Sequence, residues 1–138
     1  MESFPQPETT YRFHVSYGET DAMRVAYYGE YFHWFERARS QFIRERGMSY
    51  SEVEERGIML PVRNASCRFV RPARYDELVG VRCGIRDWGR ASITFVYEVY
   101  GPPDASTVLA RGETEHACVT PNGKPVRVPD WLKAMFGT

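Results

Sequence analysis

The sequence predicts an α+β fold in which an antiparallel sheet of about five strands packs around one long helix. The first observation behind this prediction is residues 30–46, where apolar side chains recur at helical spacing along one stripe. The second is a set of segments whose apolar and polar residues alternate, as in half-buried strands. Tight turns separate the later strands, so they should pair antiparallel and bury the helical stripe against one sheet face.

The first half of the chain holds one strand and the long helix. Residues 11–17 alternate strictly and predict a strand, with Val15 and Tyr17 on its apolar face. Residues 18–26 follow as a loop. The helix over residues 30–46 ends at Gly47, since glycine readily adopts the left-handed conformation that stops a helix. Its apolar stripe consists of Tyr31, Trp34, Phe35, Ala38 and Phe42.

The second half is mostly strand. A short helix at residues 50–56 begins after Ser49, and Glu52 three residues later completes a capping box. Strands are expected at residues 62–70, 78–88, 92–100 and 107–119, and a closing helix at residues 129–136. Gly112 breaks the alternation of the last strand, which indicates a β-bulge there.

Length and composition exclude several classes of protein. The 138 residues suffice for one domain, residues 1–138, with residues 1–9 as a flexible lead-in. The 18 basic side chains are matched by 18 acidic ones, which argues against a nucleic-acid partner. No apolar run is long enough for a membrane span. The three dispersed cysteines, Cys67, Cys83 and Cys118, fit buried thiols in a reducing cytoplasm better than disulfides or a metal site.

The loop before the long helix carries the strongest chemical signal. Glu19, Thr20 and Asp21 precede a helix whose first backbone N–H groups lack intrahelical acceptors. Such a terminus stabilises negative charge on a carbonyl oxygen, and a nearby carboxylate can attack that carbonyl or deprotonate a water. The alternative is that Asp21 only caps a turn, and the local sequence alone favours this alternative.

Other candidate sites are weaker. His14, His33 and His116 show no ligand spacing with cysteine or acidic residues, so surface or strand-face positions are expected and no metal. The sequence also lacks the Gly-x-Ser-x-Gly elbow of serine hydrolases and a phosphate-binding glycine loop.

The run from Tyr17 to Arg39, YGETDAMRVAYYGEYFHWFERAR, resembles the signature of the 4-hydroxybenzoyl-CoA thioesterase family of hotdog-fold proteins. Weaker matches follow in the same order and extend the resemblance to about residues 11–129. It implies a hotdog fold and subunits that pair sheets edge to edge, as a homodimer or homotetramer with active sites at the interface. It also implies that Asp21 is the catalytic carboxylate and that the backbone N–H of Tyr28 polarises the thioester carbonyl.

Three departures from the family pattern stand inside this run. Many bacterial members carry histidine at the position of Tyr28, although the hydroxybenzoyl-CoA enzymes have tyrosine. Arg24 replaces the usual glycine of a tight turn, and Glu30 replaces the usual asparagine. Arg24 is expected to pair with Glu19 or Glu30, or to meet a carboxylate or phosphate of the substrate.

The predicted function is therefore hydrolysis of an acyl-CoA thioester to the free acid and coenzyme A, with coenzyme A as part of the substrate and no cofactor. The residues expected to bind substrate are Tyr17, Thr20, Arg24 and, for the coenzyme A phosphates, Arg90 and Lys124. Two alternatives stay open: a hotdog hydratase or dehydratase, which usually needs a paired histidine and acid, and a ligand-binding protein that has lost the chemistry.

Overall fold

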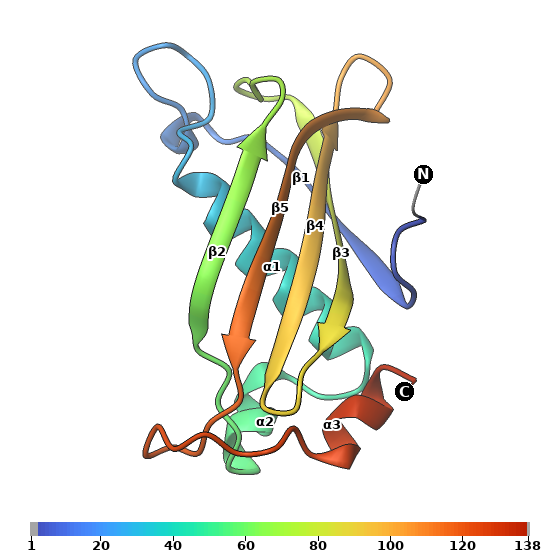
Figure 1. The fold of residues 1–138 in the computed structure, drawn as a ribbon. Helices are drawn as coiled ribbons and strands as arrows, with labels where there is room; N and C mark the ends of the chain where they lie inside the picture. The colour runs from blue at the N-terminus through green and yellow to red at the C-terminus, as the bar shows by residue number, and fades with distance from the viewer. Residues whose placement is uncertain (1–2, 138) are drawn as a thin grey trace.

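The computed structural model describes residues 3–137, so the first two residues of the expected lead-in lie outside the described part. Five strands form one antiparallel sheet in the order β1-β3-β4-β5-β2, and α1 crosses one face of it (Figure 1). The α+β prediction is thus confirmed. The elements are β1 (Glu8–His14), a 3₁₀ turn (Tyr17–Glu19), α1 (Glu30–Glu45), α2 (Tyr50–Glu55), β2 (Val62–Phe69), β3 (Leu78–Trp88), β4 (Ser92–Gly101), β5 (Thr107–Ala117) and α3 (Asp130–Met135).

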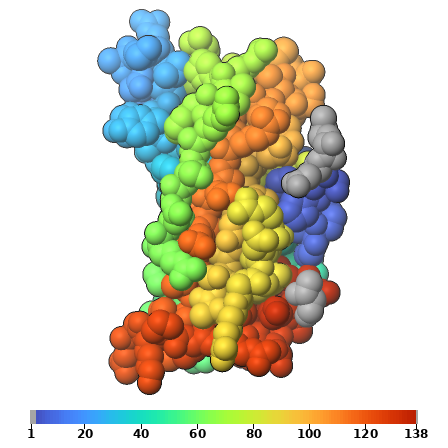
Figure 2. Space-filling view, in the orientation of Figure 1, coloured from blue at the N-terminus to red at the C-terminus, as the bar shows by residue number. Residues whose placement is uncertain are grey.

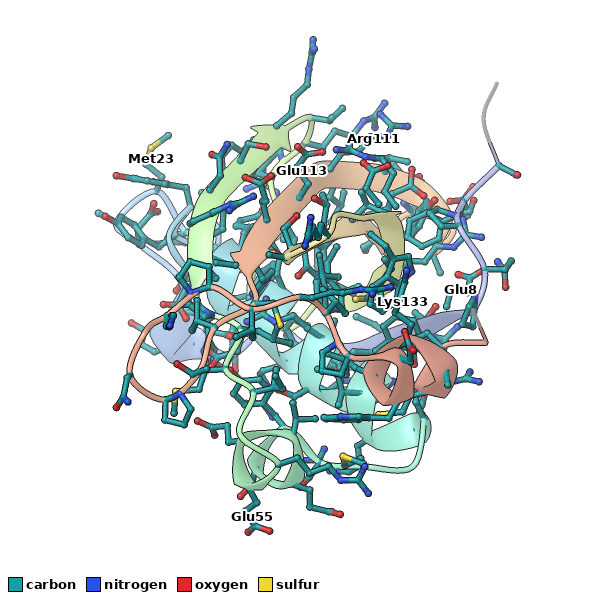
Figure 3. The ribbon with its side chains drawn as sticks, turned by 60° about the horizontal axis from the view of Figure 1, so that its bottom comes forward. Glu8, Met23, Glu55, Arg111, Glu113 and Lys133 are labelled. Atoms are coloured by element: carbon teal, nitrogen blue, oxygen red, sulfur yellow. The ribbon has the colours of Figure 1, made fainter. Side chains whose placement is uncertain are left out.

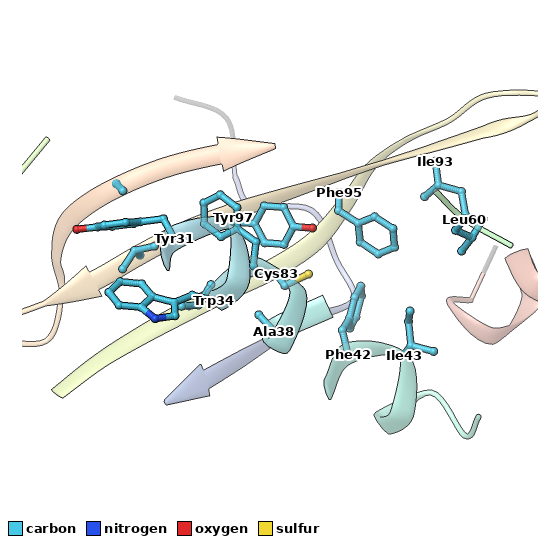
Figure 4. Close-up of a cluster of buried hydrophobic side chains, with 14 of the residues drawn as sticks. Tyr31, Trp34, Ala38, Phe42, Ile43, Leu60, Cys83, Ile93, Phe95 and Tyr97 are labelled. Carbon is cyan, nitrogen blue, oxygen red and sulfur yellow. The ribbon is translucent and has the colours of Figure 1, made fainter. Parts of the chain in front are cut away.

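The core lies between α1 and the sheet. The apolar stripe of α1 is buried as predicted, and Figure 4 shows Trp34, Ala38 and Phe42 of this stripe among the core side chains. The ring of Phe35 stacks on Tyr97 of β4 with centroids 4.2 Å apart. Each fully buried side chain of this size contributes roughly 1.5–3 kcal/mol through the hydrophobic effect. This burial holds the helix against the sheet and so fixes where the N-terminal end of α1 lies.

Gly112 has a different role from the predicted β-bulge. Its pairing with Cys67 and Tyr97 is regular, and the register shift between β4 and β5 lies instead at Val99/Tyr100. A Cβ atom at Gly112 would stand 2.5 Å from the ring of Phe35. The glycine is therefore explained by the close approach of the helix, because any side chain would displace Phe35.

The first strand lies earlier than predicted. It runs from Glu8 to His14, so Glu8 and Thr9 of the expected lead-in are strand residues. Arg82 of β3 forms an ion pair with Glu8, which extends the pairing toward the N-terminus. At the other end, the backbone N–H of Ser16 donates to the Glu19 carboxylate at 2.7 Å and turns the chain. Tyr17 consequently lies in a 3₁₀ turn and is 77% exposed, not on the apolar face of a strand.

The two ends of the sheet differ. Helices α2 and α3 cover one end, where Phe136 packs on Phe42 and Trp88. Residues 18–29 lie at the opposite end and project as a lobe beside β2 (Figures 1 and 2). None of the helices in residues 3–137 is long and apolar enough to cross a membrane.

Candidate active site

Residues 16–28 fold back on themselves as a small hairpin before α1. Its centre is a turn in which Asp21 N–H donates to Val25 O at 3.0 Å and Arg24 N–H donates to Asp21 O at 2.9 Å. Arg24 has φ of +66°, the left-handed region that glycine adopts without strain. This accounts for the departure at Arg24: the turn needs the conformation that favours glycine, and here an arginine adopts it.

The Asp21 carboxylate is only partly engaged. Its Oδ1 accepts the backbone N–H of Met23 at 2.8 Å, so the turn-capping alternative describes one of its two oxygens. Among residues 3–137, Oδ2 has no hydrogen-bond or ion-pair partner. The side chain is half-buried in a surface cleft. The cleft is lined by Tyr17, Gly18, Thr20, Asp21, Ala22, Arg24 and Tyr75.

The second half of the hairpin supplies a backbone donor. The bridge between Thr20 and Ala26 and the hydrogen bond from Tyr27 N–H to Glu19 O, 2.8 Å, lay the two halves side by side. Helix α1 begins two residues after Tyr28. Within the described chain, the backbone N–H of Tyr28 has no acceptor. An unpaired N–H beside a helix N-terminus can donate to a carbonyl oxygen bound there, where the helix dipole also favours negative charge.

Glu19 holds the hairpin onto the core and does not pair with Arg24. Its carboxylate accepts the indole N–H of Trp34 at 2.7 Å and the N–H and hydroxyl of Ser16. Burial raises the pKa of Glu19, but these hydrogen bonds outweigh it, so the pKa lies below its ordinary value and the group is ionised. Neither expected ion pair of Arg24, with Glu19 or with Glu30, is present among the described residues.

Aromatic rings surround the hairpin. Tyr17 meets Tyr75 edge to face at 5.8 Å, and the Tyr28 ring lies 6.4 Å from Phe69 at the end of β2. Met23 at the tip is 78% exposed and points away from the body of the molecule (Figure 3). The carboxylate and the free N–H therefore lie beside exposed apolar surface that extends to edge strand β2.

The structure brings together only some of the predicted site residues. Tyr17, Thr20, Asp21 and Arg24 line one cleft, and Tyr28 follows in the same hairpin. Arg90 lies in the β3–β4 turn at the opposite end of the sheet, where its carbonyl accepts Val128 N–H at 2.8 Å (Figure 1). Lys124 lies in the turn between β5 and α3, at that same end. Neither cation lies near Asp21 of the same chain.

Of the surface or strand-face positions expected for the histidines, His116 takes a strand face, the inward one of β5. It is 1% exposed and lies beneath the sheet, not at the surface. Its Nδ1 and Nε2 lie 2.8 Å from Leu60 O and Thr114 Oγ1. Burial, followed by the charge of Arg39, lowers the pKa of His116 to about 4, so the ring is neutral at pH 7. The signal was present: His116 is in phase with Thr114 and Gly112 on the inward face of β5.

The remaining histidines lie outside the cleft. His14 is exposed, and His33 pairs with Glu36 on the surface of α1 at 3.4 Å. Among residues 3–137 no three His, Cys, Asp or Glu side chains converge as metal ligands. No histidine lines the Asp21 cleft, so the cleft lacks the histidine–acid pair that a hydratase of this kind usually needs.

Comparison with known proteins gives the family. The profile of the thioesterase-like superfamily matches residues 15–136. The chain belongs to this superfamily. An acyl-CoA thioester hydrolase of Escherichia coli O6:H1 is 28% identical over 123 residues, which cover 88% of this chain and 90% of that protein. The match supports the expected resemblance along most of the sequence.

Solved structures of the superfamily agree with the fold. A hypothetical protein from Aquifex aeolicus superimposes with a TM-score of 0.86 and 31% identity, covering 93% of this chain and 98% of that one. The DHNA-CoA thioesterase of Staphylococcus aureus superimposes with a TM-score of 0.83 and 31% identity, covering 92% and 87%. The predicted hotdog fold is confirmed, and the enzyme belongs with the thioesterases.

Proposed function

We propose that this protein hydrolyses an acyl-CoA thioester to the carboxylic acid and coenzyme A, with Asp21 as its catalytic carboxylate. One observation carries the assignment of the site. The free Oδ2 of Asp21 lies in a cleft of the same hairpin that presents the unpaired N–H of Tyr28 at the start of α1. A carboxylate and a pre-positioned donor are the two groups that acyl transfer needs.

The hydrogen bond from Met23 fixes the orientation of the Asp21 carboxylate and leaves Oδ2 as the reactive oxygen. Oδ2 either attacks the thioester carbon or takes a proton from the water that does. The Tyr28 N–H donates to the carbonyl oxygen as negative charge develops there. The C–S bond then breaks, coenzyme A leaves as a thiol, and the net reaction consumes one water. No cofactor takes part in this scheme.

The assembly we propose pairs two subunits along β2. This strand is a sheet edge, since it pairs only with β5, and its outer N–H and C=O groups have no strand partner among the described residues. A second β2 running antiparallel satisfies those groups. A homodimer, or a homotetramer built from two of them, also lets Arg90 or Lys124 of one subunit approach the coenzyme A bound to another. Free Cys67, Cys83 and Cys118 suit a cytoplasmic location.

The test is a panel of short, medium, long and aryl acyl-CoAs, with released thiol detected by a colour reagent. Wild type is expected to turn over at least one class, and a folded Asp21→Asn variant none of them. Full turnover by the variant contradicts the role of Asp21. Tight acyl-CoA binding without thiol release over hours favours the ligand-binding alternative instead.

A further inference from the structure

A chain of buried side chains crosses the space between α1 and the sheet. Arg39 Nη1 donates to Tyr97 OH at 3.0 Å, and Tyr97 OH lies 2.7 Å from Thr114 Oγ1. Thr114 Oγ1 in turn lies 2.8 Å from His116 Nε2, and His116 Nδ1 lies 2.8 Å from Leu60 O. These four contacts join the long helix, strands β4 and β5, and the segment that enters β2.

The direction of every hydrogen bond in this chain is fixed by its two ends. Arginine can only donate and the Leu60 carbonyl can only accept. The Tyr97 hydroxyl must therefore donate to Thr114, Thr114 to His116 Nε2, and His116 Nδ1–H to Leu60 O. Burial raises the pKa of Tyr97 to about 12, so its hydroxyl keeps the proton that this order requires. Each hydroxyl and each ring nitrogen of these side chains thus has a hydrogen-bond partner.

Several hydrogen-bond donors beside these side chains have no acceptor within residues 3–137. Arg39 uses one N–H of its guanidinium and, among residues 3–137, has no carboxylate within ion-pair distance. The hydroxyl of Tyr50 accepts Leu60 N–H at 2.9 Å and has its own proton free in the described chain. Both residues line one small hollow of about 100 Å³, together with His116 and Leu60. Glu36, which is paired with exposed His33, and Ser40 also line the hollow.

This hollow is far from the hairpin of its own chain, and the pairing along β2 proposed above would bring it near the hairpin of a second chain. Eleven residues separate Tyr28 from Arg39, which is about 16 Å along α1. The hollow includes Leu60, just before β2, whereas Tyr28 packs on Phe69 at the other end of β2. Antiparallel pairing of two β2 strands sets the Phe69 end of one copy beside the Leu60 end of the other.

We propose that the hollow at Arg39 receives the far end of the acyl group held at Asp21 of a second copy, and that it selects acyl groups ending in a carboxylate. The inference rests on the proposed function and adds the substrate class. The guanidinium of Arg39, which has no carboxylate partner among residues 3–137, and the free hydroxyl proton of Tyr50 can together bind an anion with several acceptor oxygens. The Glu36 carboxylate, which also lines the hollow, is paired with His33. A volume of about 100 Å³ admits a carboxylate and one or two methylenes, not a long alkyl chain.

The test compares matched substrates, glutaryl-CoA against pentanoyl-CoA, on wild type and on Arg39→Met. Wild type is expected to favour glutaryl-CoA in kcat/KM by roughly ten- to a hundredfold, the range for a hydrogen bond to a charged group. Arg39→Met should lose this preference because its kcat/KM for glutaryl-CoA falls toward that for pentanoyl-CoA, and Arg39→Lys should restore part of it. Arg37→Met is the matched control, because Arg37 is an exposed cation of the same helix that packs over Tyr11.

A mixed dimer shows which copy supplies Arg39. Asp21→Asn and Arg39→Met chains are joined, so that only one site combines Asp21 of one chain with Arg39 of the other. Recovery of glutaryl-CoA preference in the mixed dimer supports action across copies, and its absence contradicts it. If wild type and Arg39→Met hydrolyse both substrates with the same ratio of kcat/KM for glutaryl-CoA to kcat/KM for pentanoyl-CoA, the inference is overturned. The thioesterase assignment then still stands.

If wild type hydrolyses neither substrate, the proposed function fails separately and calorimetry decides the inference. Tighter binding of glutaryl-CoA than of pentanoyl-CoA, lost in Arg39→Met, supports the hollow. Equal affinities, or no binding of either, overturn it. Unfolding of Arg39→Met in urea is followed alongside. If the methionine variant does not fold, Arg39→Gln carries the same comparison, because glutamine is uncharged and its amide can still donate to Tyr97 OH.

Discussion

The Asp21 hairpin and the buried chain of Arg39, Tyr97, Thr114 and His116 are both polar, but they use their hydrogen bonds in opposite ways. In the hairpin, Asp21 Oδ2 and the Tyr28 N–H are unpaired within the described residues. In the buried chain, every hydroxyl and ring nitrogen has a partner. The difference separates two tasks. Unpaired groups at the surface are available to a substrate, whereas paired groups in the interior hold helix, sheet and β2 in register.

The largest expected effect comes from removing the charge of Asp21. In Asp21→Asn the amide oxygen can still accept Met23 N–H, so the turn should persist and the free energy of unfolding should change by less than about 0.5 kcal/mol. Without the carboxylate, kcat/KM should fall about 10²- to 10⁴-fold. Thiol release and urea unfolding measure the two quantities. A large loss of stability would show that the hairpin, too, depends on its polar groups for folding.

The buried chain predicts the reverse pattern for Thr114→Val. The substitution keeps the shape but leaves the Tyr97 hydroxyl without an acceptor and His116 Nε2 without a donor, each at a cost of about 1–3 kcal/mol. Urea unfolding should therefore show a loss of roughly 4 kcal/mol. For an acyl-CoA whose acyl group is uncharged, turnover per folded molecule should stay within about threefold of the wild-type value. Ser51→Ala, an exposed position on α2, is the control with little expected change in stability.

The same contrast explains what the sequence could and could not predict. Helix α1 and strands β2–β5 were placed within a few residues, because apolar periodicity determines which face of each element is buried. The start of β1 was wrong because Glu8 is held by Arg82, a partner far along the chain. Tyr17 was placed in a strand because apolar and polar residues keep alternating up to Tyr17, although the chain already turns at Ser16–Glu19.

The candidate site also contains residues that the sequence could group correctly and residues that it could not. The hairpin is local, so its motif placed Tyr17, Thr20, Asp21, Arg24 and Tyr28 together. Arg90 and Lys124 required knowledge of which turns share an end of the sheet. Their turns, after β3 and after β5, lie at the end opposite the Asp21 hairpin (Figure 1). The buried chain joins residues from four segments. Alternation along β5 puts Thr114 and His116 on one face, but only the strand register sets that face beside Tyr97 of β4.

Acid should lower the free energy of unfolding, because it favours protonation of His116. Its folded pKa of about 4 is below the ordinary value, mainly because of burial and then the Arg39 charge, so the unfolded chain binds a proton first. The contribution of neutral His116 to the free energy of unfolding is fully present above about pH 6.5 and is lost as the pH falls toward about 4. Between pH 7 and pH 5 the loss should be about 2 kcal/mol. His116→Gln, unfolded in urea at both pH values, should lack this difference; an equal pH dependence would refute it.

The smallest expected effect tests whether the hairpin stores strain. Arg24→Gly should raise the free energy of unfolding by about 0.5–1 kcal/mol, because glycine adopts φ of +66° without a Cβ clash, although it costs more entropy on folding. Arg24→Ala keeps the clash and should leave stability unchanged. If the Arg24 side chain contacts substrate, both variants raise KM equally, since both remove the guanidinium. Equal free energies of unfolding for the two variants would mean that the left-handed conformation at residue 24 does not destabilise the fold. The hairpin would then be as free of backbone strain as the buried interior.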